Sequence, residues 1–426
     1  MSIETLYEVF KRSPGVQTDT RKIAKDEIFF ALKGPSFNGN SFALKALELG
    51  AKAVVVDEDP GIKDDRVFLV NDSLVALQEL ALHHRKQFNI PFIAITGSNG
   101  KTTTKELVHA VLETSYVTYT TAGNLNNHIG VPLTILSIGK DAQMAVIEMG
   151  ANHQKEIESY CRIALPTHGI ITNCGKAHLE GFGGIEGVRK GKGELYDFLR
   201  ANKGTAFVMW DYDYLRSMSS GIPTVITYGT HSTTTNGHVI SAEPFLKVGF
   251  DDSGINEIDT RLVGDYNLPN VLVAVAVGKF FNVSPAAIIA AISGYNPSNS
   301  RSQLIKKNGN EIILDAYNAN PSSMKVAIEN FAAQPDKNKW IILGGMMELG
   351  ETSIAEHEAI VQLLKLYSWK NVLLVGGDFA MVHHPYRFFK DAVEAGEWLK
   401  EQDVKDAMVL VKGSRSMKME RVVEFL

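Results

Sequence analysis

Residues 96–104 read Thr-Gly-Ser-Asn-Gly-Lys-Thr-Thr-Thr and combine a glycine-bracketed turn with a lysine and several hydroxyls. Gly97 and Gly100 let the backbone turn so that consecutive N–H groups converge on an anion. Lys101 can then bridge the outer phosphates of a nucleotide, and the Thr102 hydroxyl can ligate magnesium. The pattern predicts a phosphate-binding loop of variant spacing, since only two residues separate the glycines where the usual motif has four; a plain glycine turn is the alternative. The candidate nucleotide-binding residues are Gly97, Ser98, Asn99, Gly100, Lys101, Thr102 and Thr103.

A glutamate and a histidine follow apolar runs that are expected to form buried strands. Glu148 closes a strand predicted over 144–150, and His178 stands in a glycine-rich loop after a strand predicted over 169–173. Ligands of open α/β sheets bind beyond the carboxyl ends of the strands, so both side chains are expected to face the crevice of the phosphate loop. Magnesium binding is the expected role of Glu148, with a salt bridge as the alternative. A neutral His178 imidazole can ligate a metal.

Polar clusters lie beside other predicted turns. The segment 119–130 carries three asparagines and a histidine next to a glycine, which suits a polyhydroxylated or amide-bearing ligand; an ordinary polar loop is the alternative. Asn267 and Asn270 lie three residues apart at a helix start, where they can cap the helix or read the edge of a base, and the sequence alone favours capping. The cations of segment 187–195 indicate either a solvated basic turn or a phosphate clamp.

Strand and helix patterns that could position these residues alternate along the whole chain. A buried strand before residue 97 and a helix over 102–113 flank the phosphate loop. The N-terminal region carries short strand patterns at 28–32, 53–56 and 67–70 and a helix over 42–49. A polar, proline-bearing linker is expected at 295–300. Beyond it, helical stretches separate three apolar strands, which predicts a parallel sheet flanked by helices, at 340–343, 371–375 and 407–411.

The length of 426 residues and these breaks predict three α/β domains. The first is a small α/β domain over residues 1–88. The second, over 89–297, holds the phosphate loop in a mainly parallel sheet. The third, over 298–426, is again a parallel sheet covered by helices.

Composition excludes several classes of protein. A net charge of −5 gives no electrostatic reason to expect nucleic acid or an anionic membrane as a partner. No apolar run approaches the ~18 residues needed to cross a bilayer, and the N-terminus has no apolar core typical of a signal peptide. Two cysteines, Cys161 and Cys174, fit neither a zinc site nor a disulfide framework and are expected to be buried thiols. We therefore expect a cytoplasmic protein, acting as a monomer on small molecules.

Several motifs taken together resemble the Mur ligases, the ATP-dependent enzymes that build the peptide stem of peptidoglycan. They lie at 96–103, 148–152, 177–183, 192–194 and at the pair Asn267 and Asn270. Motifs at 314–324, 343–350 and 410–417 are similar to those of the family member that acts last on the stem. The resemblance runs from about residue 18 to residue 423. It implies a P-loop ATPase-like central domain, a Rossmann-like third domain, and the joining of D-alanyl-D-alanine to UDP-N-acetylmuramoyl-tripeptide.

The resemblance also implies roles that the patterns leave open. The first domain would hold the UDP sugar through Thr20, Arg21, Lys33, Asn38 and Gly39. The muramoyl-peptide would face Asn124, Asn126 and Asn127. ATP would be held by the loop, by Asn267 and Asn270 as adenine readers, and by Arg301 and Asp315 of the third domain. The candidates for gripping the dipeptide are Tyr317, Asn318 and Asn320.

Two magnesium ions are expected from the same resemblance. Thr102 and Glu148 would hold the first, and His178 would hold the second together with Lys192, carbamoylated by carbon dioxide; Lys190 is the alternative carbamoylation site. The catalytic candidates are therefore Lys101, Glu148, His178 and Lys192. Two other functions compete: another ligase of the superfamily, acting earlier in the stem pathway or resembling the folylpolyglutamate synthases, and a P-loop NTPase switch that binds a protein partner.

Overall fold

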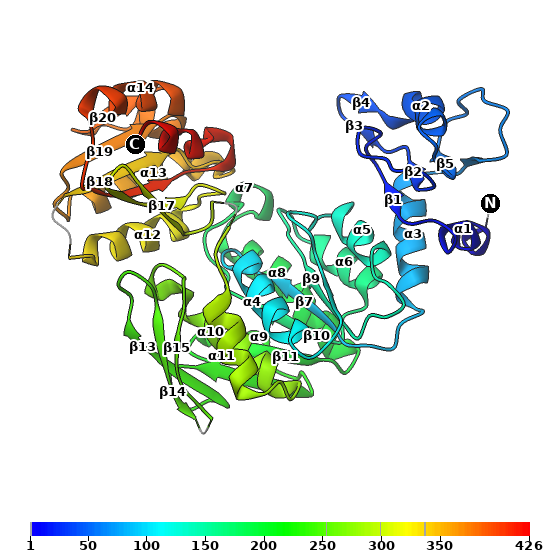
Figure 1. The fold of residues 1–426 in the computed structure, drawn as a ribbon, viewed down its shortest axis with the longest axis horizontal. Coiled ribbons are helices and arrows are strands. Elements are labelled where there is room, and N and C mark those ends of the chain that lie inside the picture. Colours follow the sequence, from blue (N-terminus) through cyan, green and yellow to red (C-terminus); the bar gives the residue numbers. More distant parts are fainter. Residues whose placement is uncertain (1, 253, 299, 336–337) are drawn as a thin grey trace.

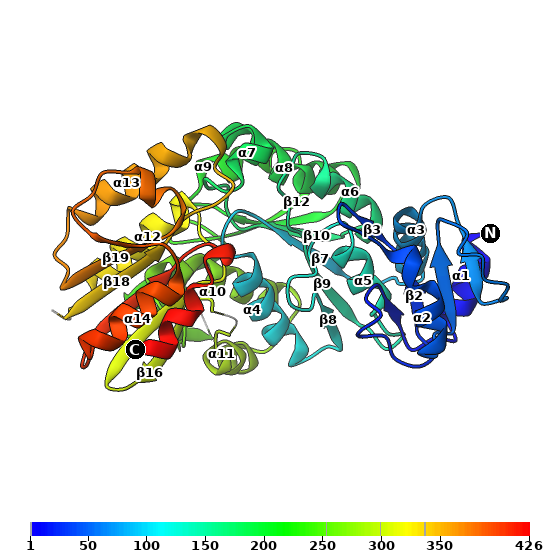
Figure 2. The same cartoon turned by 90° about the horizontal axis from the view of Figure 1, so that it is seen from above.

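The computed structural model describes residues 2–252, 254–298, 300–335 and 338–426. Its strands form a four-stranded, a nine-stranded and a six-stranded sheet in chain order, and a two-stranded hairpin lies within the N-terminal segment. The three sheets belong to three domains that lie in a row, with the central one between the other two (Figures 1 and 2). The α/β fold in three domains that the sequence predicts is confirmed.

The first domain is a small parallel sheet between helices. Its elements are α1 (Ile3–Phe10), β1 (Val16–Gln17), β2 (Ile28–Phe30), β3 (Lys33–Gly34), β4 (Phe37–Asn38), η1 (Gly39–Phe42), α2 (Ala43–Glu48), β5 (Ala53–Val56), β6 (Val67–Leu69) and α3 (Ser73–Arg85). The sheet has the order β1-β2-β5-β6. Side chains alternate between its faces, so Phe29 and Val54 pack with α2 while Phe30 and Val55 join the core of α1 and α3. Both faces are covered, as a parallel sheet requires.

Helix α3 joins the first domain to the central one. It packs against α5 (Gly130–Leu136) and α6 (Glu156–Ala164), and its apolar face shares one hydrophobic core with the central domain. Arg85, in its last turn, is buried, and its guanidinium donates to the carbonyl oxygens of Ala164 and Leu165 at 2.7 and 2.9 Å. The same group lies 3.6 Å from the centre of the Phe92 ring. The predicted boundary after residue 88 falls just beyond this helix.

The central domain is built on the nine-stranded sheet. Its strands are β7 (Phe92–Thr96), β8 (Thr118–Thr120), β9 (Met144–Glu148), β10 (His168–Ile171), β11 (Thr205–Met209), β12 (Thr224–Gly229), β13 (Thr235–Ser241), β14 (Lys247–Asp252) and β15 (Ile255–Asp259). The order is β15-β14-β13-β12-β11-β10-β7-β9-β8, parallel from β8 to β13, with β14 and β15 as an antiparallel edge. Because β9 and β10 flank β7 on opposite sides, β7 ends at the switch point where such sheets bind ligands.

Helices cover the sheet, and one of them includes a segment that was expected to form a turn. They include α4 (Lys101–Glu113), α7 (Leu179–Phe182), α8 (Ile185–Ala201), α9 (Asp213–Met218), η2 (Asp265–Asn267), α10 (Leu268–Phe280) and α11 (Pro285–Gly294). Helices α4 and α10, both predicted, pack side by side (Figure 1). Of the two alternatives for segment 187–195, the solvated basic turn is wrong, because this segment lies inside α8. Its glycines allow close packing: a Cβ atom would lie 1.8 Å from the Phe182 carbonyl oxygen at Gly187 and 2.5 Å from the Phe182 ring at Gly191.

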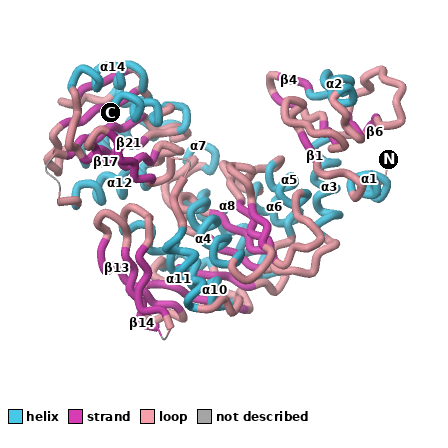
Figure 3. Tube along the Cα trace, viewed as in Figure 1, coloured by secondary structure: helices cyan, strands magenta, loops and turns pink. Residues whose placement is uncertain are grey.

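The third domain is a six-stranded sheet with helices on both faces (Figure 3). Its elements are β16 (Gln303–Lys307), β17 (Asn310–Asp315), α12 (Pro321–Ala333), β18 (Lys339–Gly344), η3 (Gly350–Thr352), α13 (Ser353–Leu364), β19 (Asn371–Val375), η4 (Gly377–Met381), β20 (Arg387–Phe389), α14 (Ala392–Gln402), β21 (Met408–Lys412), η5 (Arg415–Met417) and η6 (Met419–Phe425). The order is β16-β17-β21-β18-β19-β20, and only the β16 pairing is antiparallel. The three predicted strands are confirmed as β18, β19 and β21.

Three smaller predictions can be compared directly with the structure. The linker at 295–300 joins α11 to β16, and its described residues lie in neither helix nor strand; Asn299 lies outside the described residues. Cys161 and Cys174 are buried and unpaired, as expected. Across the described ranges, no helix combines the length and the apolar character that a bilayer crossing would need.

Candidate active site

The loop predicted to bind phosphate connects β7 to α4, and its geometry requires both glycines. Gly97 and Gly100 have φ values of 143° and 79°, a region that side chains rarely adopt. A Cβ atom at Gly97 would lie 2.0 Å from the Thr172 hydroxyl oxygen, and one at Gly100 would lie 2.7 Å from the Asn270 amide oxygen. The loop therefore lies tightly between the end of β10 and the start of α10.

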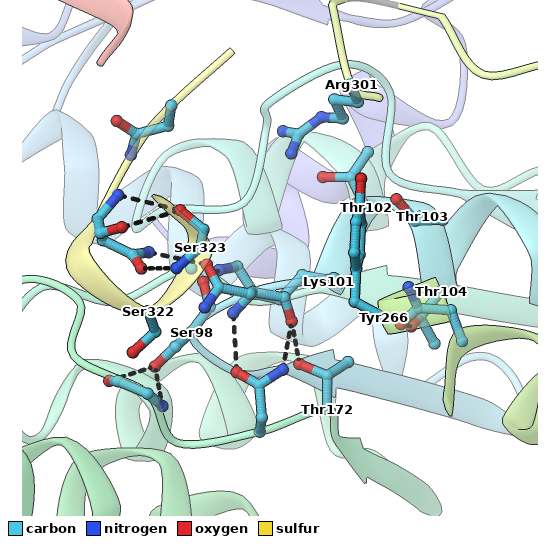
Figure 4. A pocket seen from close by; sticks show the side chains of 18 of the residues that line it. Ser98, Lys101, Thr102, Thr103, Thr104, Thr172, Tyr266, Arg301, Ser322 and Ser323 are labelled. Atoms are coloured by element: carbon cyan, nitrogen blue, oxygen red, sulfur yellow. Dashed lines mark hydrogen bonds between the residues drawn. The ribbon is translucent and has the colours of Figure 1, made fainter. Parts of the chain in front are cut away.

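Polar groups that follow β10 hold this loop in place (Figure 4). The Thr172 hydroxyl donates to the Asn99 carbonyl oxygen at 2.6 Å, and the Asn173 side-chain oxygen accepts from the Asn99 N–H at 3.1 Å. The Ser98 hydroxyl donates to the Gly175 carbonyl oxygen at 3.0 Å. The loop conformation thus depends on a segment about 75 residues further along the chain.

Lys101 begins α4, and its ammonium group folds back onto the loop. Its Nζ donates to the carbonyl oxygens of Gly97 and Ser98 at 2.7 and 3.2 Å. Burial lowers the pKa of Lys101 to about 8, while the Glu148 carboxylate acts in the opposite direction. A lysine held beside turn amides and a helix N-terminus is the arrangement that binds polyphosphates.

One cavity of about 850 Å³ opens between the central and third domains and collects most of the predicted site residues. Figure 4 shows Arg301 approaching Thr102 and Thr103, and Ser322 lying near Ser98. The predicted residues that line the cavity are Ser98, Asn99, Gly100, Lys101, Thr102, Thr103, Asn126, Asn127, Glu148, His178, Asn267, Asn270, Arg301, Asp315, Tyr317, Asn318 and Asn320. Residues predicted from separate parts of the sequence therefore surround one space.

The predicted UDP-sugar residues do not line this cavity. They are Thr20, Arg21, Lys33, Asn38 and Gly39, all in the first domain. Arg21 pairs with Asp19, which holds the pKa of that carboxyl to about 2, and Lys33 pairs with two carboxylates of the same domain. Gly39 is required because a Cβ atom there would lie 2.4 Å from the Leu32 carbonyl oxygen. Gly97, Asn124 and Lys192 also lie outside the cavity wall.

Glu148 ends β9 beside the loop and is buried. Its Oε1 accepts from the Thr102 hydroxyl at 3.2 Å and from the Asn126 amide at 2.8 Å, whereas its Oε2 is buried without a hydrogen-bond partner in the described structure. It forms no ion pair with a described residue, so the salt-bridge alternative is wrong. An unpartnered carboxylate oxygen beside a threonine hydroxyl and a phosphate loop fits Mg²⁺, which takes one or two carboxylates together with phosphates and waters.

His178 lies just before α7 with a φ of 53°, in the left-handed region. Its Nδ1 forms a hydrogen bond with the Glu348 carboxylate of the third domain, which lowers the pKa of Glu348. No group of three or more His, Cys, Asp or Glu side chains poised to hold a metal occurs within the described residues. A second ion would therefore need ligands from substrates or from a modified side chain.

Lys192 lies in α8 and is buried, with only 1% of its surface exposed. Its Nζ donates to the Ala151 carbonyl oxygen at 2.9 Å and lies 4.9 Å from the centre of the Phe182 ring. Burial, with the positive charge of Lys101 as a smaller cause, lowers the pKa of Lys192 to about 7. The alternative, Lys190, is exposed.

Asn267 and Asn270 are both buried, and neither caps α10, so the preference for capping is wrong. Asn267 has helical backbone angles and donates its amide to the Val263 carbonyl oxygen at 2.9 Å. Asn270 donates to the Asn267 side-chain oxygen at 2.8 Å and accepts from the Thr104 hydroxyl at 3.0 Å. The pair forms a polar chain that ends against the start of α4, on the wall of the cavity.

Comparisons with known proteins agree with this geometry. Three family models match in succession: "Mur ligase family, catalytic domain" over residues 14–96, "Mur ligase middle domain" over 95–278, and "Mur ligase, glutamate ligase domain" over 300–415. The UDP-N-acetylmuramoyl-tripeptide--D-alanyl-D-alanine ligase of Bacillus subtilis (strain 168) is 35% identical over 97% of this chain and 93% of its own length. The enzyme of the same name from Escherichia coli (strain K12) is 36% identical over 96% and 93%. The chain belongs to the Mur ligase family.

The crystal structure of MurF ligase from Thermotoga maritima in complex with ADP is also similar to this Mur ligase. The two share 26% sequence identity and a TM-score of 0.86, over 98% of this chain and 97% of that one. The likeness covers all three domains, including the first domain that lies apart from the cavity.

The third domain of this Mur ligase brings polar residues to the loop from the carboxyl ends of its strands. Asp315 ends β17 and pairs with Lys412, the last residue of β21. The Arg301 guanidinium lies 3.6 Å from the centre of the Tyr317 ring. The Asn320 amide, a predicted dipeptide contact, donates to the Asn99 side-chain oxygen of the phosphate loop at 2.7 Å.

Several cavity residues were not predicted from the sequence. Lys412 is buried and lines the cavity. Like Glu148, it is a charged residue at the end of an apolar strand, so the same sequence pattern could have identified it. Thr104, Tyr266 and Tyr214 also line the cavity. A tyrosine in a loop or short helix has no spacing that marks it as a cavity residue, so no sequence signal could have found the last two.

Proposed function

We propose that this chain joins D-alanyl-D-alanine to the terminal carboxylate of UDP-N-acetylmuramoyl-tripeptide, with ATP as the energy source. The observation that carries the proposal is the cavity between the central and third domains, in which the phosphate loop and Glu148 face Arg301 and Asp315. Near-full-length relatives with 35 and 36% identity bear the name of this ligase, and a similar structure was solved with ADP.

The chemistry explains why such a cavity is needed. A carboxylate and an ammonium do not condense readily in water, because both ions give up good hydration and the oxygen leaving group is poor. In the first step a carboxylate oxygen of the tripeptide attacks the γ-phosphorus of ATP, and ADP leaves. The amine of the dipeptide then attacks the acyl carbon of this acyl phosphate, loses a proton and expels inorganic phosphate.

The protein must hold several anions together while this happens. Two unit charges ~4 Å apart repel each other by roughly 4 kcal/mol at the effective dielectric of such a site. Lys101 and the loop amides would bind the polyphosphate and stabilise the phosphoryl group in transfer. Asn267 and Asn270 would contact the adenine, and Arg301 and Asp315 would hold ATP from the other side of the cavity.

Two magnesium ions are part of the proposal. Thr102 and Glu148 would hold the first, which the unpartnered Glu148 oxygen supports. His178 and a carbamoylated Lys192 would hold the second. Bound there, the ions would offset the negative charge of the phosphates and of the activated carboxylate.

Carbamoylation of Lys192 is supported by its surroundings. Carbon dioxide adds to a neutral amine, with loss of a proton, and a buried amine whose pKa is lowered to about 7 is partly neutral at physiological pH. The resulting carbamate is an anion that a nearby cation would stabilise. Lys190 is exposed and lacks this environment, so we propose Lys192 as the modified residue.

The three domains would divide the substrates. We propose that residues 1–88 hold the UDP sugar through Thr20, Arg21, Lys33, Asn38 and Gly39, and that 89–297 hold ATP. Residues 298–426 would take the dipeptide near Tyr317, Asn318 and Asn320. The loop with Asn124, Asn126 and Asn127 would face the muramoyl-peptide. The reaction would take place in the cytoplasm, by a monomer.

The test is an ADP-release assay in four arms: ATP alone, ATP with UDP-N-acetylmuramoyl-tripeptide, ATP with D-alanyl-D-alanine, and ATP with both. We expect sustained ADP release only in the last arm, together with a UDP-linked pentapeptide product. Equal release with ATP alone would instead indicate an NTPase switch. Turnover with a single amino acid and a shorter UDP-linked substrate would indicate an earlier ligase of the pathway.

A further inference from the structure

We propose that Glu348 of the third domain is a positioning residue for His178, so that docking of the third domain completes the second metal site of the central domain. The inference rests on the proposed function, in which His178 is a metal ligand. It adds a residue from a different domain and a coupling between metal binding and domain arrangement.

The contact joins two loops that are 170 residues apart in sequence. His178 lies between β10 and α7, and Glu348 lies between β18 and η3. The imidazole Nδ1–H donates to Oε2 of Glu348. His178 lines the cavity that holds the phosphate loop, so the contact lies at its edge.

Both residues have backbone conformations that side chains rarely adopt. The φ values are 53° for His178 and 61° for Glu348. Left-handed conformations at residues other than glycine persist only where surrounding structure enforces them, and they concentrate at functional sites. Two such residues in direct contact, one from each domain, point to a junction with a specific geometry.

Contacts beside the pair tie the His178 loop to the third domain. The Glu180 N–H donates to the Glu348 carbonyl oxygen at 3.5 Å. Leu179, which follows His178 directly, packs against the hydrophobic core of the third domain as well as that of the central domain. The position of the imidazole therefore depends on where the third domain lies.

The hydrogen bond has a chemical consequence for the imidazole. With the Nδ1 proton bound to a carboxylate, the neutral ring carries its free lone pair on Nε2, which is the atom left to ligate a metal. Carboxylates that bind the second nitrogen of a metal-ligating histidine fix its tautomer and orientation, and their loss typically costs about 10–100-fold in metal affinity. Glu348 has the chemistry and position for this role.

The chain offers a matched control at the same domain junction. Lys176 Nζ forms an ion pair with Glu356 of the third domain at 2.6 Å. The two glutamates both bridge the central and third domains, and Lys176 is two residues from His178. Only Glu348 contacts the imidazole, so a variant of Glu356 weakens the junction without touching the proposed ligand.

The experiment measures Mn²⁺ binding by electron paramagnetic resonance to the full-length protein, with bicarbonate and a non-hydrolysable ATP analogue present. We expect E348A to weaken one of two Mn²⁺ sites about 10–100-fold. E348Q, whose side-chain oxygen can still accept from Nδ1, is expected to stay within about threefold of wild type. E356A should bind both ions as wild type does. Circular dichroism confirms that each variant is folded.

Three outcomes would decide against the inference. If E348A binds Mn²⁺ like wild type while H178A loses one site, His178 is a ligand but Glu348 does not position it. If E348A and E356A weaken binding equally, the contact only holds the domains together. If H178A itself binds both ions normally, the proposed metal role of His178 fails and the inference fails with it.

Discussion

The two junctions between the domains of this Mur ligase are built differently. The first and central domains meet along α3, which shares a hydrophobic core with the central domain and ends in the buried Arg85. The central and third domains share a small apolar contact, which includes Val263 and Leu179. They meet mainly through polar contacts around the cavity, such as Asn99 with Asn320 and Lys176 with Glu356. Polar junctions separate at lower cost than continuous apolar cores, so we expect movement at the second junction rather than at the first.

The two junctions are suited to different roles during the reaction. A cavity between two domains must admit ATP and a peptide and then exclude water, because water would hydrolyse an acyl phosphate. The polar junction supplies that opening beside the phosphate loop. Variants at the polar junction should therefore lose activity and keep stability, whereas variants at the apolar junction should do the reverse.

The largest effect is expected for Glu148→Gln at the polar junction. The substitution keeps the size of the side chain but removes the charge that would bind magnesium, so kcat should fall about 10²–10³-fold and activity should need more Mg²⁺. The melting temperature should stay within about 2 °C of wild type. A variant with unchanged Mg²⁺ dependence would contradict the role proposed for Glu148.

Lys192→Ala tests the buried lysine of the central domain. We expect a loss of activity of about 100-fold, with partial recovery when acetate or formate is added, because a small carboxylate can occupy the place of the carbamate. Lys190→Ala is the control and should retain nearly full activity, since that side chain is exposed. If Lys192→Ala keeps full activity, and added acetate or formate changes nothing, Lys192 is not carbamoylated.

Arg85→Ala should affect stability at the apolar junction. It removes the donor to the buried carbonyl oxygen of Ala164 and to the partly buried one of Leu165. This loss costs about 2–4 kcal/mol and lowers the melting temperature by roughly 5–10 °C. The kcat should remain within about threefold of wild type. Arg66→Ala is the matched control, because Arg66 forms an exposed ion pair with Asp64 and only a long hydrogen bond of 3.5 Å to the Ala51 carbonyl oxygen. Loss of this side chain should shift the melting temperature by about 1 °C or less.

The smallest effect is expected for Asn320→Ala, which removes the contact with Asn99 of the phosphate loop. We expect the KM for ATP to rise about fivefold, since one neutral hydrogen bond contributes about 1 kcal/mol. Asn320 also caps α12 together with Ser323, so Ser323→Ala serves as the control that weakens the cap but keeps the loop contact. If Asn320→Ala and Ser323→Ala have the same KM for ATP, the whole effect comes from the weakened helix cap.

Local sequence patterns were sufficient for the elements around the phosphate loop. The strand before Gly97 and the helix after Gly100 follow from apolar spacing and turn chemistry. The patterns failed where partners distant in sequence decide the outcome. Asn267 does not cap α10 because its backbone is helical, whereas a capping residue needs an extended one.

The segment 187–195 is a second place where local sequence patterns failed. Three glycines among cations predict a turn by composition, yet all three lie in helix α8. Glycine is needed at 187 and 191 because Phe182 of α7 packs so closely that no side chain would fit there. That contact is tertiary, so neither propensity nor spacing reveals it. The same holds for Arg85, whose partners lie about 80 residues away.

Residue type and spacing along the chain were enough to predict the phosphate loop, the parallel α/β sheets and a carboxylate closing β9, because these features depend on neighbours within a few turns of chain. The tertiary structure alone decided that His178 meets Glu348, that Asp315 pairs with Lys412, and that the first-domain residues lie apart from the cavity. Those relations join segments that only packing brings together, and buried environments such as that of Lys192 arise from the same packing.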